Sequence, residues 1–131
     1  MKEPVWLLKP AVNAVHSMMI ARFGGADGIR DEGLLDSALV RPTNIYLYEE
    51  NTDIAVLAAA YAAGLIQNHP FVDGNKRIGF MAAFMFLDLN GAMLEADEIS
   101  ATAMTLSLAA SEIEEADYAE WISANIRMAS K

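Results

Sequence analysis

The sequence contains no cysteine and few basic residues, and both absences limit what the chain can do. Without cysteine, a disulfide framework and a zinc site built on thiolates are excluded. Nine lysines and arginines stand against 18 acidic residues, which gives a formal net charge of −9. A general nucleic-acid-binding surface needs a basic face to replace phosphate counterions, so we expect no direct nucleic-acid partner. Any phosphate recognition must be local and must use a few donors.

Hydrophobic runs long enough to cross a bilayer are also absent. The two most apolar stretches, 54–66 and 78–87, are shorter than the ~20 residues that a membrane-spanning helix needs. The N-terminal residues do not show the basic, apolar and small-residue pattern of a secretory signal. We therefore expect a cytoplasmic protein with no membrane partner. A chain of 131 residues that is 54% hydrophobic suits a single domain, residues 1–131, with one core.

Hydrophobic spacing and helix-boundary residues predict a compact all-α fold. Gly24 and Gly25 end the first helix, Asp31 caps the second, and Pro42 stops the second. Pro70 is expected to force His69 out of the third helix. The fourth helix is apolar on all sides, which is typical of a buried central element. The expected helices are residues 10–23, 32–40, 54–68, 75–90, 97–110 and 114–128.

Two further features of the sequence, the segment 41–53 and His16, allow both a structural and a functional interpretation. Residues 45–48 alternate apolar and aromatic side chains in the manner of a strand. The segment 41–53 is thus either a short β-hairpin, of the kind that can form a flap over a site, or an ordinary loop fixed by two tyrosines. His16 lies on the first helix with no evident partner in the sequence, and we interpret it as a polar or packing residue.

The residues with the clearest chemistry occupy nine positions, His69 to Arg77, at the start of the predicted central helix. The first turn of a helix presents unpaired N–H groups and partial positive charge, which together bind anions. Gly74 lets the backbone approach a ligand closely, and Asn75 offers a side-chain amide. Lys76 and Arg77 add formal charge. The pattern predicts a phosphate-binding site.

Two further residues of this run indicate catalysis. Asp73 would repel a bare phosphate, so its presence favours a divalent cation such as Mg²⁺ held between the carboxylate and phosphates. A neutral His69 imidazole can take a proton from an incoming hydroxyl at neutral pH. Each residue alone is common in turns, but base, carboxylate, glycine and cations together predict a functional site.

The run His69-Pro70-Phe71-Val72-Asp73-Gly74-Asn75-Lys76-Arg77 resembles the signature of the Fic/Doc superfamily, and within it that of the death-on-curing (Doc) toxins. The resemblance extends to residues 22–25, 28–35 and 87–91. It implies a helical bundle around a buried central helix. It also implies that His69 is the general base and Asp73 the Mg²⁺ ligand, that ATP is bound by Gly74, Asn75, Lys76 and Arg77, and that a flap including Asn44, Ile45 and Tyr46 docks the target.

The resemblance further implies the toxin of a toxin–antitoxin pair, restrained by a Phd-type antitoxin protein. Such a toxin transfers the γ-phosphate of ATP to a serine or threonine hydroxyl of a translation factor, elongation factor Tu, and arrests translation. AMP-transferring relatives have glycine at Lys76 and often arginine at Phe80, whereas Doc toxins share the lysine but have alanine at Gly74. Two alternatives therefore stay open: AMP transfer to a protein hydroxyl, and a non-catalytic binding module in which Lys76 blocks the nucleotide.

Overall fold

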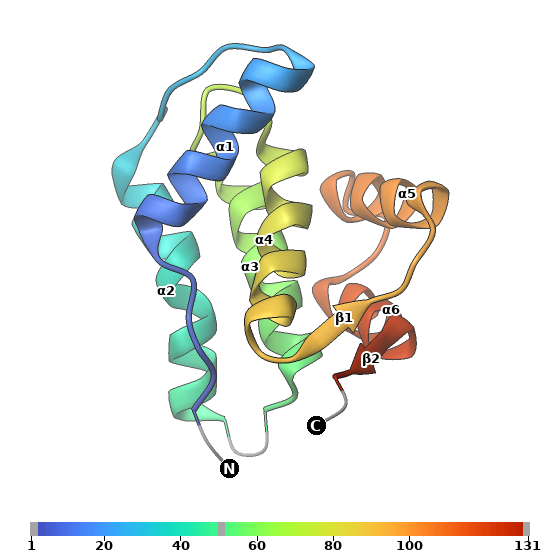
Figure 1. Ribbon diagram of the computed structural model, residues 1–131. Helices are drawn as coiled ribbons and strands as arrows, with labels where there is room; N and C mark the ends of the chain where they lie inside the picture. The colour runs from blue at the N-terminus through green and yellow to red at the C-terminus, as the bar shows by residue number, and fades with distance from the viewer. Residues whose placement is uncertain (1–2, 50–51, 130–131) are drawn as a thin grey trace.

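The computed structural model describes residues 3–49 and 52–129. Within these ranges the chain forms six α-helices and two short strands (Figure 1). This arrangement confirms the predicted all-α class, and a small antiparallel sheet is added to it. The elements are α1 (Lys9–Phe23), α2 (Glu32–Tyr48), α3 (Ile54–Asn68), α4 (Asn75–Leu89), β1 (Ala92–Leu94), α5 (Glu98–Ala109), α6 (Glu115–Asn125) and β2 (Ile126–Met128).

Helix α3 is the centre of the core, with 11 of its 15 residues buried. It lies between α2 and α4 and also contacts α6 (Figure 1). The expectation that α4 is the buried centre was therefore wrong in part. Helix α4 packs one face on α3 but exposes Lys76 and Arg77 at its start and Asp88 and Leu89 at its end. The many alanines of α3 explain the difference, because small side chains let helices approach it from several sides.

Two glycines mark the places where helices come closest to each other. A Cβ on Gly64 of α3 would lie 3.3 Å from the Cα of Ala38 in α2. A Cβ on Gly79 of α4 would lie only 2.7 Å from Cγ1 of Ile66 in α3 and 3.1 Å from the carbonyl oxygen of Ala62. The contact at Gly79 leaves no room for a methyl group, so the approach of α4 to α3 depends on the missing side chain. At Gly64 a methyl group would require α2 to move by a few tenths of an ångström.

Helix α2 continues through Pro42 to Tyr48, so the predicted stop at Pro42 was wrong. The residues with buried or half-buried side chains follow a helical spacing that runs past the proline: Leu35, Ala38, Pro42, Ile45 and Tyr46. Tyr46 packs edge-on against Trp6, with 5.6 Å between the ring centroids. An interior proline costs a helix about 3 kcal/mol or more, and here packing against α3 and the N-terminal segment offsets that cost.

Both alternatives for 41–53, a hairpin and an ordinary loop, were therefore wrong for residues 41–48, which belong to α2. Residues 50–51 lie outside the described residues. The sheet lies elsewhere, where Ala92–Leu94 pair antiparallel with Ile126–Met128 and Met93 faces Arg127. The last helix consequently ends at Asn125, three residues before the predicted end. Pairing with β1 gives the backbone of 126–128 partners outside the helix, which the local sequence could not indicate.

Most predicted helix starts are confirmed by their caps. Asp31 accepts a hydrogen bond from the Leu34 amide at 2.9 Å, and Asp97 accepts one from the Ser100 amide at 2.6 Å. Asp53 accepts from the Ala55 amide at 3.0 Å. Glu114 and Asp117 form a capping box at the start of α6. Each acid satisfies amides that the first helical turn leaves unpaired. Among the described helices, none is long and apolar enough to cross a membrane.

The close contact at Gly79 gives a stability test. We expect Gly79→Ala to lower the free energy of unfolding by about 1–3 kcal/mol, because the new methyl group collides with Ile66 and the Ala62 carbonyl. Gly33→Ala, in the exposed first turn of α2, is the matched control and should raise stability by up to about 1 kcal/mol through helix propensity. Urea unfolding of both variants checks the prediction. A stable Gly79→Ala protein would contradict the proposed closeness of α3 and α4.

Candidate functional site

The loop between α3 and α4 begins at His69, which ends α3 in the left-handed conformation with φ 51° and ψ 51°. A non-glycine residue adopts this conformation only when its surroundings hold it there. Arg30 provides part of that support. Its Nε donates to the His69 carbonyl at 2.6 Å and its Nη2 to the Asn68 carbonyl at 2.9 Å. A guanidinium bound to the last carbonyls of α3 also complements the negative end of the helix dipole.

The backbone of residues 28–31 runs alongside the loop. The amides of Arg30 and Asp31 both donate to the Pro70 carbonyl, at 2.7 and 3.0 Å, and the Val72 amide donates to the Gly28 carbonyl at 3.0 Å. Ile29 and Phe71 form an isolated β-bridge. Two segments about 40 residues apart in the sequence are thereby joined, and the loop is fixed on its outer side.

The side chain of Asn75 organises the interior of the loop. It is buried, its Oδ1 accepts from the Phe71 amide at 3.0 Å, and its Nδ2 donates to the Phe71 carbonyl at 3.0 Å. The second hydrogen of Nδ2 points to Nδ1 of His69, 3.1 Å away. The side-chain amide is thus fully used within the loop. The side chain is therefore not free to donate to a phosphate as expected, and the backbone N–H of Asn75 is the donor that remains available.

The same network orients the His69 ring. Turning the Asn75 amide over would place its oxygen against the Phe71 carbonyl and its NH₂ against the Phe71 amide, so the assigned orientation is the favourable one. Nδ1 of His69 is then a hydrogen-bond acceptor, and the neutral imidazole carries its proton on Nε2. Protonation of the ring at Nδ1 requires the bond to Asn75 to break.

His16 fixes the loop from its inner side. Its ring is 2% exposed and stacks on Phe71, with 3.8 Å between centroids and 13° between planes. Its Nε2 lies 2.7 Å from the Asp73 carbonyl oxygen, and because a carbonyl only accepts, Nε2 must carry the hydrogen. The packing role expected for His16 is confirmed, and its partner is the loop itself.

The Asp73 carboxylate lies exposed beside the connection between α1 and α2. Oδ1 accepts from the Gly74 amide at 2.8 Å, and Oδ2 is 3.4 Å from the Ala26 amide. A Cβ on Gly25 would approach Oδ2 to 2.7 Å, so glycine is needed for the carboxylate to lie there. Most of the oxygen lone pairs of Asp73 remain free for a ligand.

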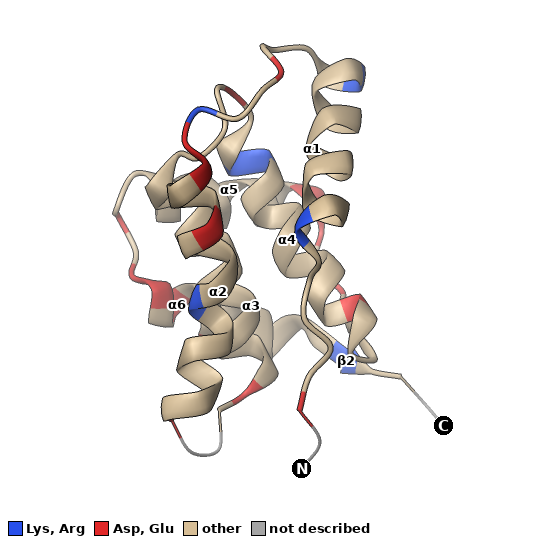
Figure 2. Ribbon diagram, turned by 90° about the vertical axis from the view of Figure 1, so that its left-hand side faces the viewer, with Lys and Arg blue, Asp and Glu red and all other residues tan. Residues whose placement is uncertain are grey.

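The start of α4 differs from those of α2, α3 and α5 because no side chain caps it. The Ile78 amide donates to the Gly74 carbonyl at 3.0 Å, whereas within the described residues the amides of Asn75, Lys76 and Arg77 have no acceptor. Lys76 and Arg77 are exposed, and no carboxylate of the described chain pairs with either. Figure 2 shows this basic turn in a chain whose other charges are mainly acidic. A helix start with amides that lack acceptors and with two basic side chains is a favourable binding site for an anion.

The donors around Asp73 fit a metal ion that is shared with a phosphate. Within the described residues, no group of three or more histidine, aspartate or glutamate side chains lies close enough to hold a metal by itself. Mg²⁺ typically binds through one or two carboxylates and uses phosphate oxygens and water for its remaining positions. A single free carboxylate beside unpaired amides matches that arrangement and does not match a metal held by protein ligands alone.

The structure brings together His69, Asp73, Gly74, Asn75, Lys76 and Arg77, all within one loop and the first turn of α4. The predicted flap residues Asn44, Ile45 and Tyr46 lie instead in the last turns of α2, at the end of the bundle away from the loop (Figure 1). Sequence reasoning missed the support from Arg30 and His16. In the sequence, Arg30 stands out only as part of residues 28–35, which carry the family resemblance. His16 has no partner nearby in the sequence.

This helical bundle, with a histidine, an acid and an uncapped basic helix start, can be compared with known protein families. Residues 6–87 match the sequence profile of the Fic/DOC family, more than half of the chain, and the chain belongs to this family.

Two curated relatives are similar to it in particular. Toxin Doc of Mycolicibacterium smegmatis is 45% identical over 76 residues, which are 57% of this chain and 58% of the relative. Protein kinase doc of Escherichia phage P1 is 35% identical over 81 residues, 62% of this chain and 64% of the relative. The match thus spans less than two thirds of the length of each relative.

The hydrogen bond from His16 to the loop can be tested by substitution. We expect His16→Phe to keep the stack on Phe71 but to leave the Asp73 carbonyl without a donor, which lowers the free energy of unfolding by about 1–3 kcal/mol. His69→Asn is the matched control, because His69 is exposed and asparagine tolerates the left-handed conformation, so its cost stays below about 1 kcal/mol. Equal losses in urea unfolding would contradict the role of His16.

Proposed function

We propose that this protein is a toxin that modifies a protein hydroxyl by transferring the γ-phosphate of ATP. The observation that carries the proposal is the start of α4. Within the described residues, three backbone amides there have no acceptor and two cations have no carboxylate partner, and they lie in the same loop and helix turn as the Asp73 carboxylate and His69. Phosphoryl transfer needs mainly alignment and electrostatic stabilisation, and this arrangement supplies donors for both. The names of the two relatives, a toxin and a protein kinase, support the same class.

Each residue of the loop has a separate task in this proposal. The amides of Asn75 to Arg77, with the side chains of Lys76 and Arg77, bind the phosphate chain. Asp73 would hold Mg²⁺, and the ion would neutralise charge on the phosphate oxygens. His69 takes the proton of the attacking hydroxyl at Nδ1, after the bond from Asn75 has broken and the ring has turned this nitrogen toward the exposed side of the loop. The hydroxyl oxygen forms the new bond to the γ-phosphorus, the bond from that phosphorus to the bridging oxygen breaks, and ADP leaves.

Lys76 is the residue on which the choice of transferred group depends. Its side chain is exposed beside the free amides of α4, so it can occupy space that a glycine would leave for phosphate. We infer that Lys76 favours transfer of the γ-phosphate over AMP. Gly74 keeps the alternative, AMP transfer, open, because the resemblance gives glycine at this position to the AMP-transferring relatives. A Cβ at Gly74 would point toward Ile20 and His16, at 3.3 and 3.5 Å.

The proposed target is a hydroxyl of a translation factor, elongation factor Tu, in the cytoplasm, and the proposed restraint is a Phd-type antitoxin. Because residues 44–46 form the end of a helix, we do not propose them as the docking flap. The target segment is expected to approach the exposed side of His69.

The product of the reaction tests the proposal directly. We expect a target incubated with this protein and MgATP to gain the mass of one phosphate and not of AMP. His69→Ala should slow this modification by about 10²–10⁴-fold, the usual contribution of a general base. Mass spectrometry of the target reads both results, and Lys76→Gly is expected to shift the product toward AMP. An AMP adduct formed by the unaltered protein would contradict kinase activity and support the alternative, AMP transfer.

The metal ligand can be tested through binding. We expect Asp73→Asn to weaken Mg²⁺-dependent ATP binding by about tenfold or more, because the neutral amide loses the charge that the cation needs. The fold should persist, since the asparagine oxygen can still accept from the Gly74 amide. Asp88→Asn, at an exposed acid near the far end of α4, is the control and should bind normally. Calorimetry with and without Mg²⁺ distinguishes the two.

A further inference from the structure

One side of α1 faces the candidate site along a single stripe. His16, Ile20 and Phe23 recur at helical spacing and therefore lie on the same face of the helix. His16 contacts the Asp73 carbonyl, and Ile20 Cδ1 would lie 3.3 Å from a Cβ on Gly74. The hydrogen bond of His16 and the close approach of Ile20 to Gly74 hold the second half of α1 in a fixed position relative to the loop. The third residue of the stripe, Phe23, therefore also has a fixed position relative to α4.

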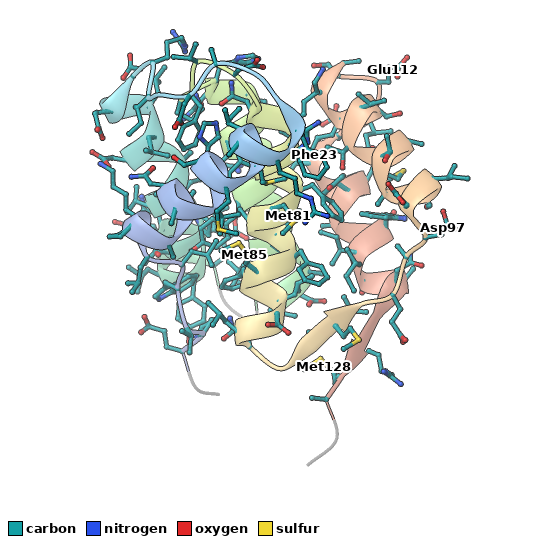
Figure 3. All side chains as sticks on the ribbon, turned by 45° about the horizontal axis from the view of Figure 1, so that its top comes forward. Phe23, Met81, Met85, Asp97, Glu112 and Met128 are labelled. Atoms are coloured by element: carbon teal, nitrogen blue, oxygen red, sulfur yellow. The ribbon has the colours of Figure 1, made fainter. Side chains whose placement is uncertain are left out.

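Phe23 contacts a residue of the anion site. The guanidinium carbon of Arg77 lies 4.6 Å from the centroid of its ring, within the range of a cation–π interaction. The side chain of Phe23 is 57% exposed, so it contributes little to the core. Figure 3 shows Phe23 at the end of α1, where that helix passes the first turns of α4. An exposed ring in this place has the arginine as its main partner.

A second arginine lies near the same ring. The guanidinium carbon of Arg22 is 5.5 Å from the Phe23 centroid, farther than that of Arg77. Within the described residues neither guanidinium pairs with a carboxylate, although the chain has twice as many acidic as basic residues. Carboxylate pairing therefore does not orient Arg77 here. The Phe23 ring lies against this guanidinium instead, and a ring face leaves the N–H groups of Arg77 free for an anion.

We propose that Phe23 is a positioning residue for Arg77, whose guanidinium it holds over the first turn of α4 for the phosphate chain of ATP. The inference rests on the proposed function. Phe23 itself does not touch the reacting atoms. Its effect is to reduce the rotamer freedom that the long Arg77 side chain would otherwise lose on binding.

Binding of MgATP, measured by calorimetry in the His69→Ala background to prevent turnover, tests the proposal. We expect Phe23→Leu, which keeps apolar volume but removes the ring face, to weaken binding by about 2- to 5-fold. Phe23→Tyr should bind normally. With Arg77→Ala already present, Phe23→Leu should have no further effect, whereas with Arg22→Ala present its full effect should remain.

The outcomes separate this inference from the proposed function. If Arg77→Ala weakens binding but Phe23→Leu does not, or if the two effects simply add, the positioning role of Phe23 is wrong and the ATP site stands. If the parent protein binds no MgATP, both proposals fail. A ligand-free measurement completes the test. The Nε–H resonance of Arg77 should carry a ring-current shift that Phe23→Leu abolishes and Arg22→Ala leaves unchanged.

Discussion

The close packing of α3 against α4 is the constraint on which the rest of this structure depends. Gly79 allows the two helices to approach until Ile66 and the Ala62 carbonyl fill the space of a side chain. Because the helices are antiparallel neighbours, this contact also fixes the span of the loop that joins them (Figure 1). The end of α3 and the start of α4 thereby lie side by side, with His69 on one and the free amides on the other.

Helix packing alone does not fix the conformation of the loop, and a set of polar contacts does so from three sides. Arg30 and the backbone of residues 28–31 hold the outer side, His16 holds the inner side, and Asn75 fills the interior. All three use hydrogen bonds to loop carbonyls or amides. The bonds between Asn75 and Phe71 are buried, so leaving either Phe71 group without its partner would cost about 1–3 kcal/mol. The side chains of Lys76 and Arg77 make no hydrogen bond to the loop within the described residues, and those of His69 and Asp73 are exposed and make one short bond each, to Asn75 and to the Gly74 amide. The residues that hold the loop and those expected to act on a ligand are thus largely distinct.

Asn75 is the residue that joins the two sets. Its amide is buried among backbone groups, yet one of its hydrogens reaches the His69 ring. The orientation of the His69 ring, the proposed general base, is thereby tied to the conformation of the loop backbone. A change at Phe71 would be transmitted to His69 through this side chain.

The sequence by itself determined the helical class, four of the helix starts and the group of residues at the site. Local chemistry was sufficient for these, because an acid before an apolar run caps its own helix and the site residues are neighbours in the chain. Only the tertiary structure decided that α2 passes through Pro42, that residues 126–128 pair with β1, and that Asn44 to Tyr46 lie away from the loop. It also decided the partners of His16, Arg30 and Phe23. Each of these depends on contacts between residues far apart in the chain, whose packing and backbone pairing outweigh local preference.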